Sequence, residues 1–256
     1  MPGLRVVITG ASSGIGAALA RHYAERGATL ALLARRGDHL KRLAATLSAE
    51  SFVYPLDVTD ATALVDAAAD FVARVGPPDR VIANAGISVG TLTQEAADLP
   101  MFERVFAVNV LGLLNTFSPF IGPMRAAGGG TLAGIASVAG VRGLPGSGAY
   151  SASKAAAITY LESLRGELRG SGIKVVTVAP GYIRTPMTYV NDYRMPFLLE
   201  VGDAVQRIAR VIEAGRSYAV VPWQMAIVSR LMRVLPNVVF DALVARAGRK
   251  PRAMSS

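Results

Sequence analysis

Short runs of apolar residues alternate along the chain with longer stretches whose apolar positions recur at helical spacing. The short runs predict seven strands, at residues 4–8, 29–33, 52–56, 80–83, 131–135, 174–178 and 218–221. Several are apolar at successive positions, which is typical of strands covered on both faces. The stretches between them predict helices at 15–26, 40–49, 61–75, 101–117, 149–169 and 203–214. This alternation predicts an α/β fold in which helices cover a doubly wound sheet of about seven parallel strands.

The pattern continues to the seventh strand without a linker rich in Pro, Gly, Ser or charge, so we predict one domain over residues 1–222. A share of 52% hydrophobic and 18% charged residues supports one large core and excludes a disordered protein. Residues 223–256 are predicted to add an extension with helical stretches at 223–235 and 238–247. The uncharged stretch 105–124 has transmembrane length, but its two asparagines and two prolines favour a buried or interface helix.

Composition excludes several kinds of chemistry. The chain has no cysteine, which excludes disulfides, thiolate nucleophiles and cysteine-bound metal centres. Its two histidines, His22 and His39, are interpreted as helix-surface residues, so we expect no metal site. The first apolar run, 4–9, is too short for a secretory signal, and we expect a cytoplasmic protein.

The formal net charge of +9 is concentrated near the C-terminus, because residues 201–256 hold nine Lys or Arg and three Asp or Glu. A basic surface can bind nucleic acid or an anionic membrane. No basic motif interleaved with aromatic residues is evident, so we do not expect a nucleic-acid partner.

A glycine-rich turn follows the first predicted strand and leads into a helix. In this arrangement backbone amides and the positive end of the helix meet a pyrophosphate, and glycine allows the close approach. The same segment matches the G-x-S-x-G elbow of serine hydrolases, but such an elbow normally follows several strands and needs a later histidine as base. The predicted binding residues of the turn are Gly10, Ser12, Ser13, Gly14, Ile15 and Gly16.

The end of the second predicted strand indicates which dinucleotide would bind. A Rossmann unit that binds NAD has an acidic residue here for the ribose 2′-hydroxyl, whereas arginine suits the 2′-phosphate of NADP. The sequence has Arg35 and Arg36 and no acid. Both arginines could instead solvate a helix start, but the missing acid favours NADP(H).

Tyr150 and Lys154 are four residues apart and would share one face of a helix, with Ser137 shortly before them. A neighbouring ammonium favours the phenolate, which brings a tyrosine closer to acid–base work near neutral pH. Ser137 could donate a hydrogen bond to a carbonyl oxygen. Tyr and Lys at this spacing also occur by chance on surface helices.

Taken in order, these motifs resemble the short-chain dehydrogenase/reductase family. Its TGxxxGxG turn corresponds to residues 9–16, its YxxxK pair to Tyr150 and Lys154, and its PGxxxT segment to residues 180–185. One departure is Ala83, which stands where many members have an asparagine before NAG. The other matching positions are Asp57 after the third strand, the NAG segment Asn84, Ala85 and Gly86, the helix asparagine Asn109, and Ser137.

The resemblance implies a carbonyl–alcohol oxidoreductase in which a nicotinamide cofactor carries the hydride. It implies that Tyr150 is the general acid or base, that Lys154 lowers the tyrosine pKa and holds the nicotinamide ribose, and that Ser137 orients the carbonyl. Asn109 would hold a water that links Lys154 to solvent. Further cofactor contacts are implied for Asp57, Val58, Asn84, Ala85, Gly86, Pro180, Gly181, Ile183 and Thr185. The alternative is a dinucleotide-binding regulator without turnover, against which this intact set argues.

The resemblance also implies a homodimer or homotetramer, with the helices at 101–117 and 149–169 as contact surfaces. It places a lid over the substrate at about 187–200, whose aromatic and methionine residues favour an apolar substrate, although core packing would explain them equally well.

In the extension, helical spacing places Ser229, Arg230 and Arg233 on one face, opposite an apolar face that includes Ile227 and Leu231. A second apolar stretch follows, with Arg246, Arg249, Lys250 and Arg252 within it or close behind. We expect the apolar face to pack on the protein. It could instead cover the cleft or lie on an anionic membrane.

Overall fold

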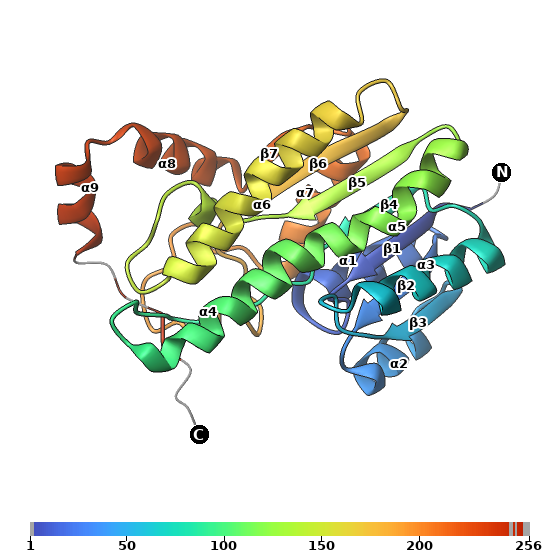
Figure 1. Ribbon diagram of the computed structural model, residues 1–256, viewed down its shortest axis with the longest axis horizontal. Helices are drawn as coiled ribbons and strands as arrows, with labels where there is room; N and C mark the ends of the chain where they lie inside the picture. Colours follow the sequence, from blue (N-terminus) through green and yellow to red (C-terminus); the bar gives the residue numbers. More distant parts are fainter. Residues whose placement is uncertain (1–2, 246–247, 249, 253–256) are drawn as a thin grey trace.

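A computed structural model describes residues 3–245, 248 and 250–252 of the chain. Its centre is a seven-stranded parallel sheet in the order β3-β2-β1-β4-β5-β6-β7 (Figure 1). The predicted α/β class and all seven predicted strands are confirmed. The strands are β1 (Arg5–Thr9), β2 (Thr29–Ala34), β3 (Ser51–Pro55), β4 (Arg80–Ala83), β5 (Gly130–Ile135), β6 (Ile173–Pro180) and β7 (Tyr218–Val221).

Helices cover both faces of the sheet, and the pleat of each strand feeds two separate cores. In β1, Val6 and Ile8 pack into the core beneath α1, α2 and α7, whereas Val7 packs into the core beneath α3, α5 and α6. This is why the strand sequences are apolar without interruption. The covering helices are α1 (Gly14–Ala24), α2 (Gly37–Ala45), α3 (Ala61–Val75), α4 (Leu99–Phe106), α5 (Gly112–Ala126), α6 (Gly148–Glu167) and α7 (Val201–Glu213).

The helix predicted at 101–117 is longer than expected and is not uniform. It runs from α4 through a π-helical turn (Ala107–Leu111) into α5, and so continues past Pro119 and Pro123. Each proline removes one backbone hydrogen bond, but the helix lies against α3 and the sheet, and packing holds it together. The stretch 96–126 is long and apolar enough to cross a membrane, yet 44% of its most apolar window is buried inside the protein.

The expectation that both histidines lie on helix surfaces is wrong for His22. His39 is exposed on α2 as predicted, but His22 is buried, with its ring against Tyr23 and its Nε2 3.9 Å from a carboxylate oxygen of Glu213 on α7. Burial, together with Arg26, lowers the pKa of His22. It therefore packs between α1 and α7 rather than facing solvent.

The C-terminal extension forms α8 (Trp223–Val234) and α9 (Asn237–Val244), which extend from the end of β7 away from the sheet (Figure 1). The predicted orientation of α8 is wrong. Met225 and Ser229 face the body and are buried, whereas Ile227 and Leu231 are 49% and 58% exposed. The small serine side chain allows close packing, and its hydroxyl bonds to the Ala226 carbonyl within the helix, so a polar residue occupies the inner face. Arg246 and Arg249 lie outside the described residues.

Candidate active site

The glycine-rich turn and the NAG segment meet because Thr9 joins β1 to β4. Its hydroxyl accepts hydrogen bonds from the backbone amides of Asn84 and Ala85 at 3.1 and 3.2 Å, and the Asn84 side chain donates to the Thr9 carbonyl at 3.0 Å. Gly10 has a φ of +67°, and a Cβ there would lie 2.8 Å from the Ala85 Cα. Glycine is therefore required where the two loops touch.

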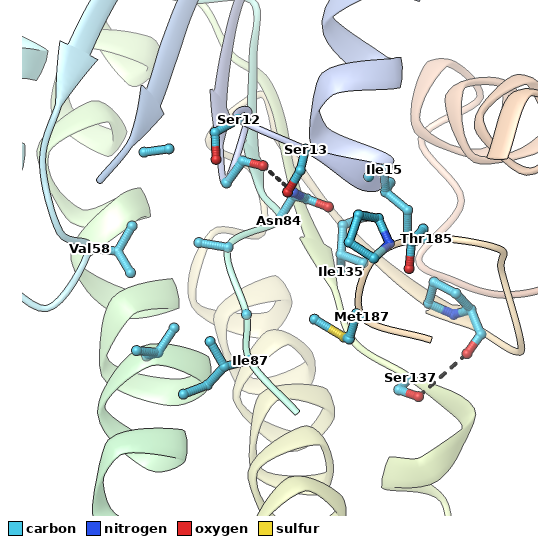
Figure 2. Close-up of a pocket in the computed structure, with 18 of the residues that line it drawn as sticks. Ser12, Ser13, Ile15, Val58, Asn84, Ile87, Ile135, Ser137, Thr185 and Met187 are labelled. Atoms are coloured by element: carbon cyan, nitrogen blue, oxygen red, sulfur yellow. Dashed lines mark hydrogen bonds between the residues drawn. The ribbon is translucent and has the colours of Figure 1, made fainter. Parts of the chain in front are cut away.

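A cavity of about 440 Å³ lies at the carboxyl ends of the strands, where ligands bind in doubly wound folds. Every predicted catalytic or cofactor residue lines it except Gly16 and Asn109. Gly16 lies behind the turn, where a Cβ would be 2.4 Å from the Gly10 carbonyl oxygen, so its contribution is close packing. Figure 2 shows Val58 and Ile87 on one side of the cavity and Ile15 and Thr185 on the other, with Met187 between them.

The two arginines after β2 lie at one end of this cavity. The guanidinium of Arg36 donates to the hydroxyls of Ser12 and Ser13 at 3.0 and 2.8 Å, which fixes it against the glycine-rich turn. Arg35 is 61% exposed, and its nearest carboxylate oxygen, on Asp57, is 3.8 Å away. This end of the cavity therefore holds one guanidinium fixed by two hydroxyls and one that is largely exposed and makes only a long ion pair with Asp57.

Asp57 has strong partners of its own. Its Oδ1 accepts from the amide and hydroxyl of Thr59 at 3.0 and 2.9 Å, and Arg104 donates to Oδ2 at 2.5 Å. Burial alone would raise the pKa of Asp57, but the hydrogen bonds from Thr59 and Arg104 outweigh it and lower that pKa. The sequence reasoning missed Arg104, because it comes from α4, 47 residues further along the chain.

Ser137, Tyr150 and Lys154 meet at the other end of the cavity. Lys154 is 4% exposed, its ammonium donates to the Ile135 carbonyl at 2.8 Å, and its Nζ lies 5.8 Å from the centroid of the Tyr150 ring. Ser137 Oγ accepts from the Ala139 amide at 3.1 Å, and its hydroxyl points to the Pro180 carbonyl, 3.5 Å away (Figure 2).

The electrostatics differ from the expectation that Lys154 lowers the tyrosine pKa. Burial raises the pKa of Tyr150, and a hydrogen bond with Ser137 acts in the opposite direction. Burial also lowers the pKa of Lys154 to about 8. A low-dielectric site penalises the phenolate and the ammonium alike, so burial is the main cause of both shifts.

Asn109 lies in the π-helical turn between α4 and α5, where the wider backbone is typical of functional positions. Its Nδ2 donates to the Ile87 carbonyl and the Ser153 hydroxyl at 3.0 and 2.9 Å, and its Oδ1 accepts from the Ile87 amide at 2.9 Å. A Cβ on Gly86 would lie 3.2 Å from that Oδ1 and 3.4 Å from the Lys154 Nζ. Asn109 therefore joins Ser153, the residue before Lys154, to the loop after β4.

Several residues of the cavity were not predicted, although their positions carry a signal. Most of them directly follow or precede a motif residue, and their apolar character was assigned to the core. Thr188 is another, since its hydroxyl donates to the Ile183 and Thr185 carbonyls at 2.7 and 3.0 Å and shapes the turn that carries Thr185. The unpredicted lining residues are Ala34, Leu56, Ile87, Val108, Ile135, Ala136, Pro186 and Thr188.

The segment expected to act as a lid, residues 187–199, is a loop whose two ends are fixed together. Ile183 pairs with Leu199, and Arg184 bonds to Glu200 at 2.7 Å. Within the loop, Met187 lines the cavity and Tyr193 lies with its ring 6.3 Å from the ring of Tyr182. Phe197, at 49% exposed, faces outward.

A dinucleotide fits these residues. The turn before α1 borders the cavity through Gly10 and Gly14, which carry no side chain, the guanidinium pair suits phosphate, and Lys154 can hold a ribose hydroxyl.

Comparison with known proteins agrees with this geometry. The family model of short chain dehydrogenases matches residues 5–194. An uncharacterized oxidoreductase of Myxococcus xanthus is 39% identical over 94% of this chain and 96% of its own length. The cis-4-hydroxycyclohexanecarboxylate dehydrogenase of Sinomonas cyclohexanicum is 33% identical over 83% of this chain and 86% of its own.

Solved structures give the same result. A short-chain type dehydrogenase/reductase from Mycobacterium marinum superposes with a TM-score of 0.77 and 27% identity, covering 85% of this chain and 93% of that one. An alcohol dehydrogenase from Thermococcus sibiricus, complexed with 5-hydroxy-NADP, has a TM-score of 0.76 and 26% identity, covering 85% and 95%. Members of the short-chain dehydrogenase family bind nicotinamide dinucleotides. The chain belongs to this family and is one of its oxidoreductases.

Proposed function

We propose that the protein interconverts a carbonyl, as ketone or aldehyde, and the corresponding alcohol with NADP(H). The observation that carries this proposal is the meeting of Ser137, Tyr150 and Lys154 at one end of a cavity whose other end holds Arg35 and Arg36. When bound, the reduced cofactor supplies the hydride that a carbonyl carbon accepts. The acid–base and orienting steps then belong to the side chains of this chain.

In the reduction, Tyr150 donates its phenolic proton to the carbonyl oxygen, and in the oxidation it accepts that proton. Ser137 donates a hydrogen bond to the same oxygen and orients it. The ammonium of Lys154 stabilises the phenolate that remains and holds the cofactor ribose. Asn109 fixes the loop beside Lys154 and supports the path by which a proton returns through water.

The preference for NADP(H) rests on the two guanidiniums after β2. Arg36 is positioned in advance by Ser12 and Ser13, and the exposed Arg35 is free to pair with a 2′-phosphate. Where NAD would need a carboxylate near the ribose, Asp57 is already paired with Arg104 and Thr59.

The substrate is proposed to be fairly apolar, because Ile87, Ile135 and Met187 line the cavity. The first test is a screen of ketones, aldehydes and alcohols with both dinucleotides, followed through the absorbance of the reduced nicotinamide. We expect turnover with NADP(H) at a kcat/KM at least tenfold above that with NAD(H). Tight NADP(H) binding without turnover of any carbonyl or alcohol would favour the alternative, a dinucleotide-binding regulator.

We also propose that the enzyme is cytoplasmic and forms a homodimer or homotetramer. Leu111 and Leu114, on the outer side of the helix formed by α4 and α5, are 55% and 36% exposed, and an oligomer would cover them. Light scattering at working concentration is the test, and a monomer would contradict it.

A second surface is proposed to contact an anionic membrane peripherally. Ile227, Leu231 and Val234 form an exposed apolar stripe along α8, and the exposed Arg230 and Arg233 lie beside them. Apolar side chains next to arginines suit the interface of a bilayer with anionic headgroups. Such a location would suit an apolar substrate.

A further inference from the structure

The end of the described chain returns from α9 to the active-site side of the protein. The amide of Gly90 donates to the Pro251 carbonyl at 3.0 Å, and Gly90 pairs with Arg252 as a parallel bridge. A Cβ at Gly90 would lie 2.2 Å from the Lys250 carbonyl oxygen, so the two backbones are in direct contact. We call Gly248 and residues 250–252 the strap.

One end of the strap is fixed by charge. Arg252 donates from Nε to one oxygen of Asp98 at 2.9 Å and from a terminal nitrogen to the other at 3.1 Å, and Glu95 adds a contact at 3.4 Å. Asp98 is 7% exposed and also accepts from the Leu92 amide at 2.8 Å. A fork held on both carboxylate oxygens of a buried residue has little freedom to rotate.

The other end of the strap contacts the lid, residues 187–199. Lys250 is 9% exposed, and its ammonium donates to the Met187 carbonyl at 3.2 Å. A Cβ on Gly248 would lie 2.2 Å from the Tyr193 Cβ, so a glycine lets the strap pass directly against the lid. Met187 itself lines the cavity. The strap therefore joins the loop at 90–98 to the part of the lid that borders the active site.

These contacts have a consequence for the lid. The chain before and after the lid is joined by the Ile183–Leu199 pair, whereas the lid itself is held through Met187, its first residue, by a lysine 63 residues further along the chain. A charged hydrogen bond from Lys250 and a close contact of Gly248 with the Tyr193 side chain therefore fix the position of Met187 and Tyr193.

We propose that the strap is a positioning element of the active site, in which Arg252 and Lys250 hold the lid in the arrangement that encloses the substrate. This proposal rests on the proposed function for its effect on catalysis, but not for its effect on the lid. Neither residue touches the reacting atoms. Loss of the strap contacts should therefore weaken substrate binding and leave the chemical step largely intact.

The test compares Arg252→Ala with the wild type and with Arg216→Ala, an exposed arginine in the turn before β7. Hydrogen exchange of peptides covering residues 185–199 should be at least about fivefold faster in Arg252→Ala, with peptides of β1 unchanged. The KM for the carbonyl substrate should rise about tenfold, with kcat within about threefold and the NADPH Kd within about twofold. Arg252→Lys keeps the charge but not the guanidinium fork, so its exchange rate and KM should lie between those of the wild type and Arg252→Ala.

Lys250→Met provides a second probe, because it removes the ammonium and keeps most of the side-chain volume. It should speed exchange around Met187 without releasing the Arg252–Asp98 pair. Unchanged exchange of the lid in both variants would overturn the proposal, and so would faster exchange with an unchanged KM. If the wild type turns over no carbonyl or alcohol, the proposed function fails, whereas the exchange comparison still decides whether the strap holds the lid.

Discussion

The carboxyl edge of the sheet and the C-terminal extension are held to the protein in different ways. At the edge, Thr9 is fully buried and its hydroxyl joins β1 to the backbone that follows β4, and the buried Lys154 lines the cavity. The extension is held largely by arginines. Arg142 donates to the carbonyls of Met232 and Leu235 and stacks on Phe240, 4.0 Å from the ring centroid.

This difference separates a rigid part of the molecule from an adjustable one. Side chains at the ends of buried strands keep their geometry because the strands cannot move independently. Contacts made by arginines near the surface are weaker and can be exchanged for other partners. We therefore expect changes at the edge to affect chemistry and cofactor choice strongly, and changes in the extension to affect substrate binding and association more gently.

The largest effect is expected at the edge, for Tyr150→Phe. This change removes the transferable proton and keeps the ring, so kcat should fall by roughly 10² to 10⁴. The NADPH Kd should stay within about threefold, because the phenol is not needed to hold the phosphates. Initial rates and a fluorescence titration of NADPH measure the two quantities. Tyr160→Phe, on the same helix, is the matched control, and turnover of Tyr150→Phe within a few-fold of the wild type would contradict the assignment.

Cofactor choice should change next, through Arg35→Ala. Losing one charge-assisted contact to the 2′-phosphate should weaken NADPH binding about 10- to 100-fold and NADH binding less than about threefold. Dissociation constants for both cofactors measure the change, with the exposed Arg42→Ala on α2 as control. Equal weakening of the two cofactors would assign Arg35 a structural role only.

The sequence predicted the edge better than the extension, for a physical reason. Strand positions follow from local apolar runs, and the motif residues lie at strand ends, so topology brings them together. The π-helical turn at Asn109 and the Arg104–Asp57 pair depend on contacts between elements and leave no local signal. In α8, spacing alone placed Ser229 on the outer face, because hydropathy does not report that a small polar residue can pack closely.

A moderate effect on the stability of the fold is expected when Lys154 is replaced. Burial lowers the pKa of Lys154 to about 8 from a reference value of 10.5, so the unfolded chain binds this proton more tightly than the folded protein does. The buried ammonium therefore destabilises the fold at pH 7, and this cost declines as the pH rises from about 8 towards 10.5.

Lys154→Met should accordingly raise the melting temperature by a few degrees at pH 7, and the gain should shrink as the pH approaches about 10. Thermal melts across this range measure it, with the exposed Lys41→Met as control. Activity should fall at the same time. A lower melting temperature at pH 7 would show that the hydrogen bond to the Ile135 carbonyl outweighs the cost of burial.

The smallest effect is expected in the extension, for the double change Leu231→Ser and Val234→Ser. These side chains are 58% and 76% exposed, so their loss should shift the melting temperature by less than about 2 °C. Membrane binding should fall about fivefold or more, since each apolar side chain inserted at the interface contributes on the order of 1 kcal/mol. Cosedimentation with anionic vesicles at low salt measures this binding. In the same assay, neutral vesicles or higher salt should weaken binding of the wild type.

Val65→Ser, which removes a 53% exposed side chain on α3, is the matched control for the double variant on α8. A wild-type chain that stays in the supernatant would exclude membrane contact. If the double variant also changes the oligomeric state in light scattering, the stripe on α8 is covered by a second copy instead.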